Sequence, residues 1–110
     1  MTIPASNECA VIATDLLGNI THWNGAAERL YGWKRDEVMG RNILAVTPAQ
    51  TSSDDAASIM AQLVAGKSWS GKFTVQNRQG EVFQVHVTDT PLCDETGELV
   101  GVVGISRRIP

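Results

Sequence analysis

The chain has 110 residues, a formal net charge of −3 and a hydrophobic content of 43%. This length suffices for one domain with one core and is too short for two. The acidic balance argues against nucleic acid, which needs a clustered basic face, and no apolar run reaches the length of a membrane span. Residues 1–8 lack the layout of a secretory signal, so we expect an N-terminal extension there and a cytoplasmic domain over 9–110.

The first third of the chain predicts two strands, a tight turn between them and a short helix. Residues 11–12 favour the first strand, an Asp-x-x-Gly turn follows at 15–18, and residues 20–23 favour the second strand. Asn24 stands where a helix N-cap belongs, directly ahead of the helix-forming residues 26–30.

One longer helix is predicted between residues 52 and 66. Its apolar residues fall at positions i, i+1, i+4 and i+5, which makes one stripe of a helix face. These residues are Ile59, Met60, Leu63 and Val64. Ser52 or Ser53 provides the N-cap, and Gly66 marks the end of the helix.

Three strand-like runs complete the chain, at 72–76, 82–90 and 99–105. Turn sequences rich in Asn, Asp and Gly separate them at 77–80 and 94–97. The order of elements is therefore two strands, short helices, one longer helix and three strands.

The stretch from Ala10 to Gly40 resembles the opening of a PAS sensor domain. The likeness rests on the Asp-x-x-Gly turn, the Trp-Asn step at 23–24, the Tyr-Gly pair at 31–32 and Glu-Val-Met-Gly at 37–40. The order of the remaining elements extends the likeness over almost the whole chain. It implies an α+β fold, with a five-stranded antiparallel sheet of strand order 2-1-5-4-3 and with short helices and one longer helix on one face.

The resemblance implies a sensory or regulatory domain of a larger bacterial signal-transduction protein. The host would be a histidine kinase, a cyclic-di-GMP enzyme or a transcription regulator. Such domains bind small ligands or partner proteins and pass a change of state to an effector domain.

We expect no enzymatic activity and no metal site. The candidate for a catalytic set consists of three polar residues, His86, Thr88 and Asp89. Thr88 and Asp89 are neighbours on a predicted strand and point to opposite faces, which counts against a shared site. Cys9 and Cys93, without a close pair of histidines, make a poor zinc site.

The PAS resemblance implies a pocket between the sheet and the helices, and the candidate inward-facing residues are all apolar. Such a set either packs solid or leaves room for a small apolar or amphipathic ligand. The candidates are Val11, Leu30, Met39, Ile43, Leu44, Ile59, Leu63, Phe73, Val75, Val85, Val87, Val103 and Ile105.

The light-sensing flavin chemistry of LOV domains is not expected. Gly-Arg-Asn at 40–42 resembles the start of the LOV motif, but the next residue is Ile43, which cannot form a thiol adduct. The residues that hydrogen-bond to the flavin in LOV domains correspond here to Val75, Val85 and Ser106. The loss of these hydrogen bonds removes most of the recognition of a polar ring edge.

FAD and heme are the alternatives, as cofactors of a redox or gas sensor. Trp-Ser-Gly at 69–71 together with Asn77 resembles the sequence of FAD-binding PAS domains, although Trp-Ser-Gly also opens this strand in PAS domains without a cofactor. Heme would need an axial histidine, residues 54–66 contain none, and Met60 fits the apolar stripe better than an iron site. We therefore predict no firmly bound cofactor, with FAD ahead of heme.

Two further expectations concern partners. The resemblance implies dimerisation through the outer face of the sheet, for which plausible residues are Trp69, Val82, Gln84, His86 and Thr88. PAS domains often end in an Asp-Ile-Thr sequence that joins the effector domain. Here Arg108 and Pro110 stand at the Asp and Thr positions. Either the output linker is altered or the chain is a fragment excised from a longer protein, and we favour the fragment.

Overall fold

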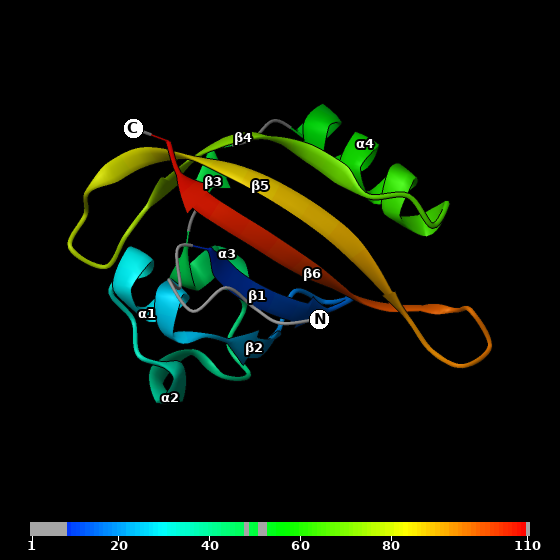
Figure 1. Ribbon diagram of the computed structural model, residues 1–110, viewed down its shortest axis with the longest axis horizontal. Coiled ribbons are helices and arrows are strands. Elements are labelled where there is room, and N and C mark those ends of the chain that lie inside the picture. Colours follow the sequence, from blue (N-terminus) through cyan, green and yellow to red (C-terminus); the bar gives the residue numbers. More distant parts are fainter. Residues whose placement is uncertain (1–8, 48, 51–52, 110) are drawn as a thin grey trace.

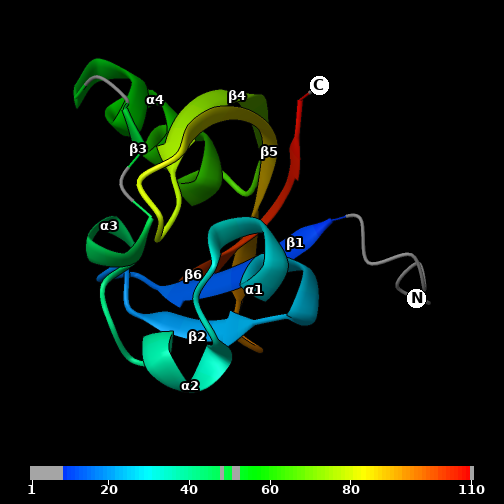
Figure 2. The same cartoon turned by 90° about the vertical axis from the view of Figure 1, so that its left-hand side faces the viewer.

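The computed structural model of the protein describes residues 9–47, 49–50 and 53–109. An antiparallel sheet forms one layer, and the helices lie against one of its faces (Figures 1 and 2). The strands are β1 (Ala10–Asp15), β2 (Ile20–Trp23), β3 (Ala49–Gln50), β4 (Trp69–Gln76), β5 (Val82–Cys93) and β6 (Leu99–Arg108). The helices are α1 (Gly25–Tyr31), α2 (Arg35–Val38), α3 (Ile43–Val46) and α4 (Ser53–Val64).

The order of the sheet is β2-β1-β6-β5-β4-β3. With the two-residue strand β3 set aside, this is the predicted five-stranded order 2-1-5-4-3, which is confirmed. Strand β3 adds a short sixth strand beyond β4, through the pairs Ala49–Val75 and Gln50–Thr74. Two residues are too few to produce a period-two pattern, so the sequence did not reveal it. Residues 1–8, Ser52 and Pro110, on which we had expectations, lie outside the described residues.

Asn24 joins helix α1 to strand β1. Its Oδ1 accepts hydrogen bonds from the backbone N–H of Ala27, at 2.9 Å, and of Val11, at 3.0 Å. Its Nδ2 donates to the carbonyl oxygen of Cys9 at 3.2 Å. One side chain therefore caps the helix, as predicted, and also fixes the position of the helix against the sheet.

Both edges of the sheet are partly covered by other backbone. On the β2 side, the backbone N–H of Ile20 donates to the carbonyl of Arg41, and Gly40 N–H donates to the carbonyl of Ile20. An isolated bridge between Asn19 and Asn42 continues this pairing. On the other side, β3 covers part of β4.

The core lies between the sheet and the helices and is centred on aromatic residues. The ring of Tyr31, on α1, lies 5.7 Å from the ring of Trp23 and 6.3 Å from that of Phe83, measured between centroids. All three side chains are buried. The indole N–H of Trp23 donates a hydrogen bond to the carbonyl of Trp33 at 3.0 Å. The only polar atom of this large core side chain therefore has a hydrogen-bond partner.

The register of β5 and β6 determines which residues face the helices. Paired residues of antiparallel strands point to the same face, and Val87 pairs with Ser106 while Asp89 pairs with Gly104. The alternate pairs, Thr88 with Ile105 and Thr90 with Val103, consequently face outward.

Our assignment of Val103 and Ile105 to the inner face was therefore wrong, and so was that of Val11, which pairs with Ile105. Strand β6 contains apolar residues in both phases, Val102 as well as Val103, so alternation alone did not fix its orientation.

Candidate functional site

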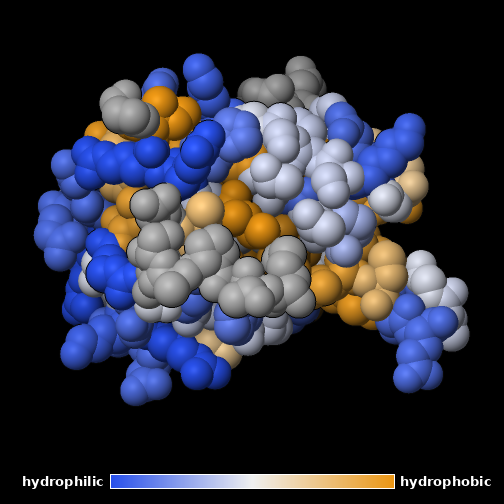
Figure 3. Space-filling view, viewed as in Figure 1, coloured by the Kyte–Doolittle hydropathy of each residue, from blue (hydrophilic) through white to orange (hydrophobic). Residues whose placement is uncertain are grey.

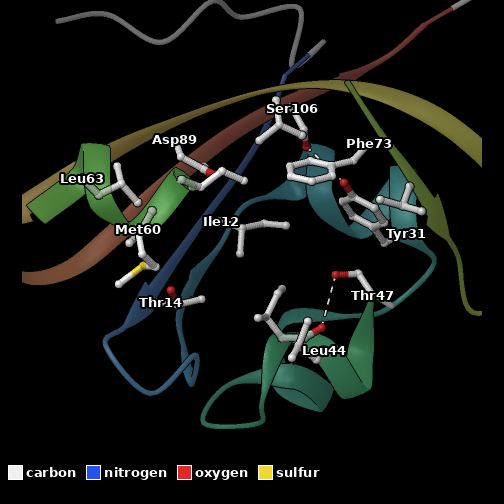
Figure 4. A pocket seen from close by; sticks show the side chains of 16 residues that line it. Ile12, Thr14, Tyr31, Leu44, Thr47, Met60, Leu63, Phe73, Asp89 and Ser106 are labelled. Carbon is white, nitrogen blue, oxygen red and sulfur yellow. Dashed lines mark hydrogen bonds between the residues drawn. The ribbon is translucent and has the colours of Figure 1, made fainter. Parts of the chain in front are cut away.

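A cavity of about 290 Å³ lies between the inner face of the sheet and helices α3 and α4 (Figure 4). This volume is at the lower end of the range for small-molecule sites, roughly 300 to 1,000 Å³. Its described lining consists of Ile12, Thr14, Tyr31, Ile43, Leu44, Thr47, Ile59, Met60, Leu63, Phe73, Val75, Val87, Asp89, Val102, Gly104 and Ser106. The lining is mainly aliphatic and aromatic, with a few polar groups.

Many of the candidate pocket residues lie around this cavity. Those that line it are Ile43, Leu44, Ile59, Leu63, Phe73, Val75 and Val87. Leu44 and Met60 are 65% and 41% exposed, which places them at the rim rather than at the floor. The cavity is therefore bounded by α3 and α4 on one side and by the central strands on the other.

Six candidates lie elsewhere, and one of them, Val11, faces outward together with its strand partner Ile105. Leu30 packs against the core cluster, Val85 is fully buried within it, and Met39 is 37% exposed and away from the cavity. Val103 and Ile105 face outward, as described above. Their places in the lining of the cavity are taken by the residues of the opposite phase, Val102, Gly104 and Ser106.

The buried polar pair at one end of the cavity is formed by Tyr31 and Ser106. Their hydroxyl oxygens lie 3.1 Å apart, and the two residues are 3% and 5% exposed. Burial raises the pKa of the Tyr31 hydroxyl, so it stays protonated at neutral pH. The pair is internally satisfied and connects α1 to β6 across the core.

Asp89 is the acidic group that faces the cavity. Its neighbours in the sheet are Trp69 on β4 and Gly104 on β6. Among the described residues, none donates a hydrogen bond to its carboxylate, and the cavity lining contains no lysine, arginine or histidine. Burial raises the pKa of Asp89 from its ordinary value of 3.8 to about 6.

The sequence analysis missed Asp89 as a pocket residue, although the signal was present. The alternation of Phe83, Val85 and Val87 extends to position 89, so period two alone puts this side chain on the inner face. We used that argument only to separate Asp89 from Thr88. An acidic residue that continues an apolar stripe is the pattern that would have identified it.

The fold and the cavity are those of a known family. A family model described as the PAS fold matches residues 3–109. The chain belongs to the PAS family. It is thus a domain of a sensory and regulatory kind, as the opening residues had indicated.

Known proteins similar to this PAS domain include a regulatory protein and a phytochrome. It is 27% identical over 100 residues to a nitrogen fixation regulatory protein of Klebsiella pneumoniae, covering 91% of this chain and 20% of that protein. Phytochrome 1 of Selaginella martensii is 26% identical over 104 residues, covering 84% of this chain and 9% of that protein. The chain therefore spans a fifth or less of the length of these relatives.

Solved structures agree with this fold. A PAS domain from Colwellia psychrerythraea superposes with a TM-score of 0.74 at 25% identity, over 92% of this chain and 86% of that one. A blue-light activated histidine kinase of Erythrobacter litoralis superposes with a TM-score of 0.77 at 20% identity, over 93% of this chain and 33% of that one. The second likeness shows the fold alone.

The residues of the PAS cavity do not fit a flavin of the LOV type. Ile43 lines the cavity, so a branched aliphatic side chain occupies the position expected for the reactive cysteine. Val75 lines the cavity as well, and the hydroxyl of Ser106 is already bonded to Tyr31. Polar recognition of a ring edge is therefore absent at these positions.

Trp69 and Asn77, the candidates for an FAD site, are not brought together. Asn77 belongs to the β4–β5 turn, where its Oδ1 accepts from the N–H of Glu81 and its own N–H donates to the Glu81 carbonyl. The ring of Trp69, at the other end of β4, lies 5.2 Å from the ring of Phe73 and covers Gly71. Trp69 thus faces inward, and its assignment to the outer face was wrong.

Within the described residues, no cluster of three or more His, Cys, Asp or Glu side chains could hold a metal ion. In the same part of the chain, no helix combines the length and the apolar character needed to cross a membrane.

Proposed function

We propose that this PAS domain senses a small apolar or amphipathic molecule that binds in the cavity between the sheet and helices α3 and α4. The observation that carries this proposal is the cavity itself, about 290 Å³ in volume and lined mainly by apolar side chains. A largely apolar lining with a few polar groups is typical of small-molecule sites.

The domain would act within a larger bacterial signal-transduction protein, in the cytoplasm and without catalytic activity of its own. We infer a host that is a histidine kinase, a cyclic-di-GMP enzyme or a transcription regulator. The similarity to a nitrogen fixation regulatory protein supports a host of this general kind.

Strand β6 is the proposed route of the signal. Val102, Gly104 and Ser106 of this strand line the cavity, and the same strand ends at Arg108. The guanidinium of Arg108 pairs with both carboxylate oxygens of Glu81, at 3.2 and 3.1 Å, and lies 4.4 Å from the ring centroid of Phe83. A ligand that shifts β6 would thereby act on the Arg108–Glu81 pair at the end of this strand.

We also propose that the outer face of the sheet mediates dimerisation. Val11, Val103 and Ile105 lie together on this face, as their register shows, and Leu92 at the end of β5 is 39% exposed. Figure 3 views this face and shows hydrophobic surface beside polar surface. His86 and Thr88, which we had predicted for the interface, point to the same face.

Purification under native conditions tests the proposed ligand. We expect mass spectrometry of the denatured protein to detect a released small molecule, and an ultraviolet–visible spectrum without flavin or heme bands. Val87→Phe places a larger side chain in the cavity and should lower recovery of the molecule at least tenfold. Val64→Phe makes the same change at the exposed end of α4, outside the lining of the cavity; it is the matched control and should retain the molecule.

Two outcomes contradict the proposal. The first is that the folded parent and the folded Val87→Phe variant both release no small molecule. The domain would then serve in protein interaction alone. A flavin or Soret band would make the domain a cofactor-based sensor instead.

A further inference from the structure

We propose that the cavity selects cationic ligands, namely small molecules with an apolar body and an ammonium or amidinium group that pairs with the carboxylate of Asp89. This inference rests on the proposed function and specifies the chemical class of its ligand. Neither the family match nor the similar proteins assign a role to this residue.

The first argument is the position of the carboxylate. Asp89 lies on the inner face of β5, two residues along from Val87, and Figure 4 shows its side chain among those that surround the cavity. Opposite it on β6 stands Gly104, where a Cβ atom would lie 3.0 Å from Asp89 Oδ1. The absence of a side chain at Gly104 leaves the carboxylate room within the cavity wall.

The second argument is the absence of a counter-ion in the described lining. The elements around the cavity contribute aliphatic, aromatic and hydroxyl groups, but no described lining residue carries a positive charge. Asp89 is half-buried, so its carboxylate loses part of its hydration without compensation, and a charge removed from water is tolerated best when it is paired. A cationic ligand supplies that partner, whereas an anionic ligand would be repelled.

The third argument is that the other polar groups of the cavity are neutral, and most of them already form hydrogen bonds within the protein. Tyr31 and Ser106 bond to each other, and Thr47 donates its hydroxyl to the carbonyl of Ile43 at 3.3 Å. Thr14 offers a neutral hydroxyl on the β1 side of the cavity. Asp89 is therefore the group that decides the charge of the ligand.

The affinity should depend on pH because the ionised carboxylate is the binding form. Tyr31, the other titratable group of the described lining, stays protonated because burial raises its pKa. Affinity for an alkylammonium ion should therefore be constant from pH 7 to 9 and fall below about pH 6, where Asp89 takes up a proton. At still higher pH, an alkylamine loses its own charge, near pH 10.

Three six-carbon probes test the inference, since they share a short linear alkyl body and differ in the charge of the polar group. Hexylammonium, 1-hexanol and hexanoate are titrated into the full chain, and chemical-shift changes of the cavity residues are followed by NMR. We expect hexylammonium to bind at least tenfold more tightly than hexanol, and hexanoate to bind most weakly. Asp89→Asn, which keeps the shape and removes the charge, should abolish the preference for the cation.

A matched carboxylate outside the cavity provides the control. Asp36 is exposed on α2, and Asp36→Asn should leave the preference unchanged. Equal binding of hexylammonium and hexanol to the unaltered chain, or a preference that survives Asp89→Asn, would overturn the inference while the proposed ligand cavity stands. If none of the probes shifts a cavity resonance of the folded protein at millimolar concentration, the inference and the proposed function both fail.

Discussion

At the scale of single residues, the ionised carboxylate of Asp89 is unfavourable in the folded protein. Its pKa of about 6 reflects burial, without a compensating partner among the described residues. The folded state therefore binds a proton more tightly than the unfolded state does. Between about pH 4 and pH 6 the stability of the protein should fall as the pH rises, and above pH 6 the cost of the ionised carboxylate is fully present.

Asp89→Asn should consequently stabilise the ligand-free protein at pH 7. The displacement of the pKa from 3.8 to about 6 sets an upper limit of about 3 kcal/mol on the gain, and we expect about 1 to 3 kcal/mol. Urea unfolding at pH 4, 5, 6 and 7 measures this gain as the difference between variant and parent. That difference should grow with pH and then level off.

Asp36→Asn is the comparison for this measurement, because the residue is exposed and should show no such growth. A difference between Asp89→Asn and the parent that is independent of pH would contradict the assignment of a raised pKa to Asp89.

At the scale of secondary-structure elements, Asn24 is the joint between α1 and the sheet. The three hydrogen bonds of its side chain satisfy the helix end at Ala27, the backbone of β1 at Val11 and the carbonyl of Cys9, which directly precedes β1. Asn24→Ala removes all of them in a partly buried position. We expect a loss of about 2 to 3 kcal/mol in the free energy of unfolding, measured with urea.

Asn42→Ala is the matched control for this joint. Asn42 caps α3 by accepting from the N–H of Leu44 and donates to the carbonyl of Leu17, but both bonds are exposed. Its replacement should cost about 1 kcal/mol. A loss for Asn24→Ala no greater than the loss for Asn42→Ala would show that the contacts with β1 contribute nothing.

The elements also show what the sequence could predict and what it could not. The Asp-x-x-Gly turn, the Asn24 cap and the five main strands followed from local residue types, because each depends on neighbours in the chain. The inner face of β6 did not follow. Its apolar residues occupy both phases, and the register with β5, which tertiary pairing sets, decides that Val102 rather than Val103 faces the cavity.

The extents of the strands were underestimated for a similar reason. Strand β5 continues through Pro91 to Cys93, and β6 continues through two arginines to Arg108. Proline and charged residues are poor strand formers by local preference. Here the long pairing between β5 and β6 outweighs that preference.

At the scale of the whole molecule, the sheet separates two surfaces with different proposed roles. The inner face bounds the ligand cavity, and the outer face carries the apolar residues Val11, Val103 and Ile105. Ile105 lies between Thr88 of β5 and Val11 of β1, near the middle of that outer face. An association of two copies would bury it.

Sedimentation velocity over a range of concentrations tests this association. We expect the parent to show a dimer fraction that rises with concentration, and Ile105→Lys to remain monomeric, because burying an unpaired charge in an apolar contact is costly. Lys67→Ala, which lies beyond the end of α4, should leave the dimer unchanged. A parent that stays monomeric at millimolar concentration would exclude the outer face as a self-association surface.

The partial cover on both edges of the sheet has a consequence for how copies of the chain meet. Uncovered edge strands invite strand addition from another chain and lead to polymerisation. Here the segment at Gly40–Arg41 occupies the free side of β2, and β3 occupies part of the free side of β4. Both edges are thereby partly closed to ladder growth. The proposed contact between copies would therefore be directed toward the outer face of the sheet, where association can stop at a dimer.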